Sequence, residues 1–194
     1  MSEIANRLGR IEPVGPDGPF DRMGNVVRYL QSRGLAARKN DGELLRKLLE
    51  LPVRPPPARI SVARMARMLN MSRRTLGRRC LKAGLPSPRQ VLCFGRVLRT
   101  LEVMREMGWS MDRATRVTGW SDAFGFSDAT LRLTGMRPTL AREKDLVVVA
   151  EAWLQQELSA GNVVLRDPEP PPCPSCGREL EFQAHRSSVP PSIS

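Results

Sequence analysis

The chain has 194 residues, enough for one or two small domains, and it carries a net charge of +11. This surplus favours a polyanionic partner, either nucleic acid or an acidic membrane surface. No apolar run approaches the roughly 18 residues of a membrane span, and the N-terminus lacks the apolar core of a signal peptide. The four cysteines do not form a secreted disulfide framework. We therefore expect a cytoplasmic location and no membrane partner.

The positive charge is concentrated in one part of the chain. The segment from Leu51 to Leu101 has twelve basic residues and no acidic one, whereas the segment from Ser110 to Lys144 has six basic and four acidic residues. A GC-rich genome would explain why nearly all the basic residues are arginines, but not why acidic residues are missing from one segment. The uneven distribution therefore indicates a surface for a polyanion in the first of these segments.

The N-terminal part is too small for a sizeable sensor domain. Residues 1–20 contain several Pro and Gly residues and are predicted to be irregular, whereas residues 21–58 are predicted to form a helical segment that ends in a Pro-rich linker. Within it we expect helices from Met23 to Leu35 and from Glu43 to Leu51, with a break at residues 39–42. This hairpin would either pack on the next domain or pair with a second chain in a homodimer.

Two short helices are then predicted to meet at a tight corner. Ser61 can cap the first, over residues 62–69, because a serine oxygen accepts hydrogen bonds from first-turn amides. Asn70 lies where the chain must turn sharply, and Asn tolerates the left-handed backbone better than most residues. Ser72 can cap the second helix, over residues 73–83. This spacing is typical of a helix-turn-helix unit.

The same plan occurs a second time after a long helix over about residues 88–107, which would span roughly 30 Å. Ser110 can cap a helix over residues 111–118, a corner follows at residues 119–121, and a further helix is expected over residues 122–134. The predicted fold is all-α, with two helix-turn-helix units joined by a long linker helix.

Several motifs occur in a fixed order along residues 59–144. They include Asn70-Met71-Ser72 at the first corner, Gly119-Trp120-Ser121 at the second, and the closing sequence GMRPTLAR from Gly135 to Arg142. These residues resemble the DNA-binding domain of the AraC/XylS family of transcription regulators, which normally has Gly-Phe-Ser at the second corner. The resemblance implies a non-enzymatic regulator that binds double-stranded DNA, with two recognition helices in successive major grooves.

The resemblance also implies which residues contact DNA. Arg74 and Arg78 match positions that reach base edges, and bidentate Arg to guanine is the commonest specific contact; the alternative is a solvated or phosphate-binding face. Phe124 can pack either on a thymine methyl group or in the core. The complete predicted set is Arg73, Arg74, Thr75, Arg78, Arg79, Lys82, Ala123, Phe124, Ser127 and Asp128.

Three departures from the family pattern make the two units unequal. Cys80 stands where the family often has a large aromatic residue, and Gly77 lacks a side chain at a base-contacting position. Asp128 stands where the family often has Arg, and an acid repels phosphates although it can accept a hydrogen bond from a cytosine amino group. We therefore expect the first unit to dominate DNA binding.

Two C-terminal segments complete the chain. Residues 145–162 are predicted to form an amphipathic helix, either folded back on the DNA-binding domain or used for dimerisation. Residues 163–194 form a Pro-rich tail with a C-x-x-C motif at Cys173 and Cys176. Two thiolates at this spacing can chelate Zn²⁺, with His185 as a candidate third ligand. The alternative is a disordered tail with free thiols.

Two other functions fit parts of this pattern. The first is an adaptor that uses the helix over residues 145–160 and the Cys tail to engage RNA polymerase or another protein, with only weak DNA binding. The second is a methyl-acceptor DNA-repair enzyme, since some of these join a cysteine zinc site to an AraC-like domain. The acceptor domain is missing here, so no enzymatic activity is expected.

Overall fold

The computed structural model describes residues 22–50 and 60–166, which form nine helices and no strand. This confirms the all-α prediction for the described part of the chain. None of these helices is long and apolar enough to cross a membrane. In chain order they are α2 (Arg22–Ser32), α3 (Lys39–Glu50), α4 (Val62–Met68), α5 (Arg73–Lys82), α6 (Pro88–Glu106), α7 (Met111–Val117), α8 (Ala123–Thr134), α9 (Pro138–Glu143) and α10 (Leu146–Ser159).

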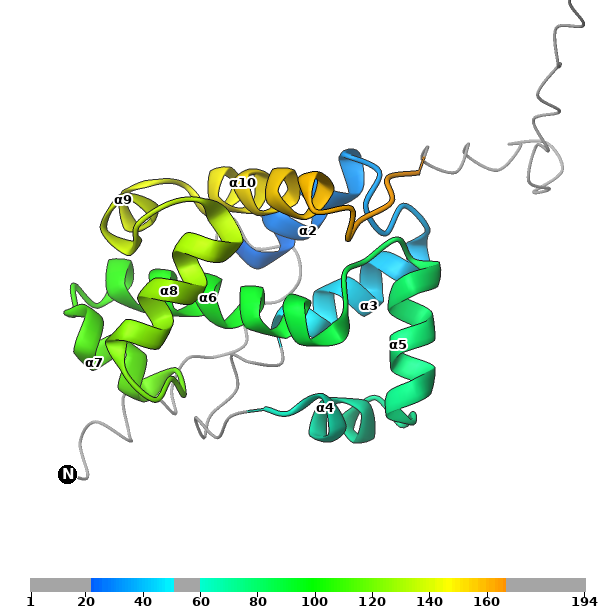
Figure 1. The fold of residues 1–194 in the computed structure, drawn as a ribbon, viewed down its shortest axis with the longest axis horizontal. Helices are drawn as coiled ribbons and strands as arrows, with labels where there is room; N and C mark the ends of the chain where they lie inside the picture. The colour runs from blue at the N-terminus through cyan, green and yellow to red at the C-terminus, as the bar shows by residue number, and fades with distance from the viewer. Residues whose placement is uncertain (1–21, 51–59, 167–194) are drawn as a thin grey trace, which may run out of the picture.

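The linker helix α6 crosses the middle of the molecule, with α4 and α5 towards one end and α7 and α8 at the other (Figure 1). It has 19 residues, of which ten are buried, so it is covered on most of its sides. Ser87 starts the helix in a capping box with Gln90, and Pro88 follows at the first helical position. With 19 residues at 1.5 Å per residue, the helix is about 28 Å long.

Helices α3 and α10 pack on α6, and α2 packs on both of them. The α2–α3 hairpin packs on α6 through α3 and on α10 through α2, which confirms that this hairpin covers the next domain. Helix α10 also packs on α8, and its Trp153 stacks on Phe94 of α6 with ring centroids 4.2 Å apart. Of the two alternatives for this helix, the structure shows the one in which it folds back on the preceding helices.

A buried carboxylate fixes α10 to the beginning of α6. Glu157 is 4% exposed, and it accepts hydrogen bonds from Gln90 Nε2 at 3.1 Å, Trp153 Nε1 at 3.2 Å and Asn162 Nδ2 at 2.8 Å. A buried charge is costly unless donors surround it, and here three donors do so. Because Gln90 also belongs to the capping box of α6, this contact joins the two helices where α6 begins.

The break predicted at residues 39–42 was wrong, because α3 already begins at Lys39. The turn lies earlier, where Gly34 and Ala36 have positive φ angles of 84° and 51°. Gly42 is a helical residue, and a Cβ atom there would lie 2.1 Å from Gln31 Nε2. This glycine therefore allows α2 and α3 to approach closely and does not mark a turn.

After α10 the chain passes over the turn between α5 and α6, at Gly84, and the turn between α2 and α3, at Gly34. The amide of Val164 donates to the Gly84 carbonyl at 3.3 Å, and the amide of Arg166 donates to the Gly34 carbonyl at 3.0 Å. Both glycines have left-handed backbones, and an added Cβ would lie 2.2 Å from Val164 O at Gly84 and 2.4 Å from Arg166 O at Gly34. Residues 163–166, called the C-terminal strap below, thus hold the α2–α3 and α5–α6 corners together.

Because the strap contacts Gly84 but not Gly108, alanine should destabilise the fold more at Gly84 than at Gly108. Gly108→Ala should lower the free energy of unfolding by about 1–2 kcal/mol, the cost of a left-handed alanine, because no atom lies within 4 Å of the new methyl group. Gly84→Ala should cost at least about 1 kcal/mol more, because the Val164 hydrogen bond must also open. Urea unfolding monitored by circular dichroism measures both variants. Equal losses would show that the strap adds nothing to stability.

Candidate nucleic-acid interface

The first corner is held by backbone conformation and two serine caps. Asn70 has a φ angle of 53°, and the Met71 amide donates to the carbonyl of the buried Ala66 at 2.9 Å. Ser61 Oγ accepts from the Arg64 amide at 3.2 Å and Ser72 Oγ accepts from the Thr75 amide at 3.0 Å. These contacts confirm the predicted turn and both predicted caps.

The second corner follows the same plan with one additional residue. Gly119 is left-handed with a φ angle of 80°, and the Trp120 amide donates to the Thr115 carbonyl at 3.1 Å. The capping residue is Asp122, whose Oδ1 accepts from the Gly125 amide at 2.6 Å, so α8 begins at Ala123. The capping residue Asp122 thus lies three residues after the left-handed Gly119. In the first corner the capping residue lies only two residues after the left-handed one.

Trp120 connects the second corner to the linker helix. Its indole Nε1 donates to Thr100 Oγ1 of α6 at 3.0 Å, and this hydroxyl lies 2.9 Å from Thr118 Oγ1. Its ring packs edge-on against Phe126 with the centroids 5.6 Å apart. A phenylalanine could make the ring contact but not the hydrogen bond, which explains how Trp fits at this position. Trp109, like Trp120, is partly buried and packs against the core.

The caps place α5 and α8 in the same register. Counting from Ser72 and Asp122, the buried Leu76 corresponds to the buried Phe126, and both lie four residues after their caps. The outward positions then correspond as well, because both helices have the same periodicity. The corresponding outward pairs are Arg74 with Phe124, Gly77 with Ser127, Arg78 with Asp128, and Leu81 with Leu131.

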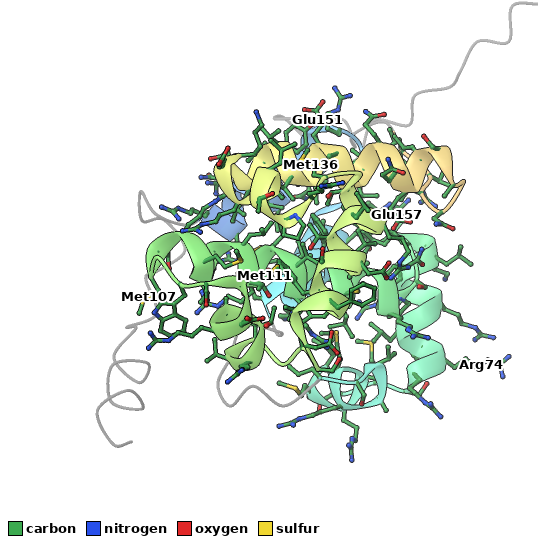
Figure 2. The ribbon with its side chains drawn as sticks, turned by 60° about the vertical axis from the view of Figure 1, so that its left-hand side comes forward. Arg74, Met107, Met111, Met136, Glu151 and Glu157 are labelled. Carbon is green, nitrogen blue, oxygen red and sulfur yellow. The ribbon has the colours of Figure 1, made fainter. Side chains whose placement is uncertain are left out.

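The outward surface of α5 is basic. Its five basic residues are all exposed, and none forms an ion pair within 4.0 Å with an acidic residue of the described segments. Figure 2 shows Arg74 pointing away from the body of the molecule. Thr75 is also exposed, but its hydroxyl lies 2.9 Å from Ser72 Oγ and takes part in the cap. The five are Arg73, Arg74, Arg78, Arg79 and Lys82.

Arg79 differs from the other basic residues of α5 in its surroundings. It lines a cleft of about 490 Å³ between α3 and the first corner, together with Glu43, Lys47 and Glu50 of α3. Arg74 and Arg78 do not line this cleft. The structure therefore places Arg79 at the flank of α5, beside acidic residues of the N-terminal hairpin.

The outward surface of α8 is apolar and acidic at its first two turns. Phe124 is 82% exposed, so the alternative that it packs in the core was wrong. Asp128 is exposed one turn later, and Ala123 and Ser127 are partly buried. The structure brings these four predicted residues together at the start of α8. The sequence alone does not determine the exposure of Phe124, because that exposure depends on how α8 packs on the core.

The predicted zinc ligands lie outside the residues that the structure describes. Cys173, Cys176 and His185 lie beyond the described residues, and the described segments contain no group of three His, Cys, Asp or Glu side chains that could hold a metal ion. Of the two described cysteines, Cys80 is buried, which raises its pKa to about 12. The Cys80 thiol is therefore protonated at neutral pH and fills the position where the related family often has an aromatic ring.

Comparison with known proteins gives one family and one solved structure. The family described as "Helix-turn-helix domain" matches residues 65–144, which include both corners and both outward helices. The crystal structure of a DNA-binding transcriptional dual regulator from Escherichia coli K-12 is similar, with 22% identity, a TM-score of 0.45, and coverage of 53% of this chain and 92% of that chain. No curated protein matches the chain. Residues 65–144 thus form a helix-turn-helix domain of the AraC type.

Proposed function

We propose that the chain binds double-stranded DNA sequence-specifically as a transcription regulator, with α5 and α8 in successive major grooves and α5 providing most of the affinity. The observation that carries this proposal is the common register of two capped helices at opposite ends of α6. In helix-turn-helix proteins the N-terminal residues of the recognition helix contact base edges. Binding, without catalysis, accounts for this arrangement.

The length of α6 supports binding to adjacent grooves. Its 19 residues span about 28 Å, and successive major grooves on one side of B-DNA lie about 34 Å apart. The burial of α6 and its contacts with α3, α9 and α10 keep this spacing nearly constant. For example, Arg105 Nη2 of α6 donates to the Ala141 carbonyl at the end of α9 at 2.9 Å.

The two outward surfaces support different roles. Arg74 and Arg78, four residues apart on α5, are the proposed contacts to guanine edges, because a guanidinium matches the two acceptors of guanine. Arg73, Arg79 and Lys82 flank them as proposed phosphate contacts, which position the helix without specifying sequence. Helix α8 has no basic residue among its first nine, Ala123 to Leu131, so it offers less electrostatic attraction to DNA than α5 does.

The adaptor hypothesis is less well supported. It requires the apolar side of α10 for another protein, but Val149, Trp153 and Leu154 on that side are fully buried within this chain. The positive surface of α5 has no role in that hypothesis. Contacts with RNA polymerase, a homodimer and a zinc ion at Cys173 and Cys176 stay predictions.

The proposal is tested by selecting bound duplexes from a random pool and measuring their affinity by gel shift against random-sequence competitor. We expect one preferred sequence with two half-sites on the same side of the duplex, and binding that weakens steeply as salt increases. Weak binding without a preferred sequence, together with a stable complex with another protein, would instead support the adaptor hypothesis.

Two alanine variants test the unequal roles of the recognition helices. Arg78→Ala should weaken binding to the selected duplex by about 5-fold to 150-fold, since a bidentate Arg–guanine contact is worth about 1–3 kcal/mol. Ser127→Ala, one residue before the corresponding position of α8, should cost less. Gel-shift titration of both variants at the same salt concentration gives the comparison. Equal losses would indicate that the two units contribute equally.

Gly77 allows a test of how closely α5 approaches the bases. A Cβ atom at Gly77 would meet no atom within 4 Å, so Gly77→Ala should raise the free energy of unfolding by up to about 1 kcal/mol. We expect the same variant to bind DNA less tightly, because its methyl group would lie beside Arg74, one turn further along the surface that faces the groove. Greater stability with unchanged affinity would place this face away from the bases.

A further inference from the structure

Phe124 is a large apolar side chain that the fold leaves exposed to solvent. It is 82% exposed, more than any other large hydrophobic side chain of the described residues. Single exposed apolar side chains are common on protein surfaces, so the significance of this ring comes from its place at the start of α8, on the outward surface of the second helix-turn-helix unit. The neighbouring Gly125 has no side chain that could shield the ring on that flank.

The position of Phe124 in α8 is fixed from two directions. The Asp122 side chain caps the helix through the Gly125 amide, so Phe124 is the second helical residue. Two residues later, Phe126 is fully buried against Trp120, and residues two apart lie about 200° apart around a helix. The ring of Phe124 therefore points away from the core, at the position that Arg74 occupies in α5.

The chemistry of this position differs from that of Arg74. A phenyl ring has no hydrogen-bond donor for guanine, and the base-edge feature that it can bury in the major groove is the C5-methyl group of thymine. Asp128, one turn further on the same side, cannot donate to guanine either when ionised. Phe124 and Asp128 therefore do not offer guanine the donors that Arg74 and Arg78 offer on α5.

We infer that Phe124 is a specificity-determining residue that contacts the C5-methyl group of a thymine in the second half-site. This inference rests on the proposed function, and it adds the base feature that the second unit recognises. The two half-sites then differ in composition, with guanine contacted by α5 and thymine by α8. Because the site is asymmetric, the protein binds it in one orientation.

Uracil differs from thymine only by the missing methyl group, so it provides a direct test. In the duplex selected from the random pool, each thymine is replaced in turn by uracil, and affinity is measured by gel shift with the full chain. We expect one replacement to weaken binding about fourfold, the effect of leaving one methyl group unburied. That thymine should lie in the half-site other than the one whose guanine preference Arg78→Ala relaxes.

Two variants decide whether Phe124 causes this effect. Phe124→Ala should bind the thymine duplex less tightly than the unmodified chain and should lose the response to uracil. Leu140→Ala removes another exposed apolar side chain, 47% exposed on α9, and should retain that response. Circular dichroism checks that both variants fold. A uracil response that survives in Phe124→Ala, or no response at any thymine of a selectively bound duplex, would overturn the inference alone; absence of selective binding would overturn the proposed function as well.

Discussion

The burial of α6 is the constraint on which the other features depend. Ten of its 19 residues are buried, because α3, α8, α9 and α10 all pack on it. A helix covered on most sides cannot bend without disturbing several contacts, so the separation of its ends is fixed by packing. Because one helix-turn-helix unit lies at each end, the distance between α5 and α8 is determined by the core of the domain.

The capping residues then determine which side chains face outward. Ser72 and Asp122 start α5 and α8 at equivalent points, and Leu76 and Phe126 rotate the two helices onto the core in the same way. The two units are thus alike in backbone but different in surface chemistry. A chain that repeats one scaffold with different outward residues suits an asymmetric site, whereas a symmetric dimer matches a palindromic or nearly palindromic site.

Features encoded by local side chains could be predicted from the sequence. Ser61, Ser72 and Ser110 cap their helices and Asn70 turns the chain as predicted, because caps and turns depend on neighbouring residues. The start of α3 was wrong because Gly42 marks a close contact with Gln31, which no local pattern indicates. The C-terminal strap was not predicted, since it is held through backbone groups at Gly34 and Gly84 that come together only in the folded chain.

The spacing between the two half-sites tests the central claim most directly. In the selected duplex, about five base pairs inserted between the half-sites place them on opposite sides of the DNA, half a helical turn apart. If α6 holds α5 and α8 at a fixed distance, affinity should fall to that of a duplex with only the first half-site. Affinity unchanged by the insertion would contradict the account, because it would mean that the two units bind independently or that α8 does not contact DNA.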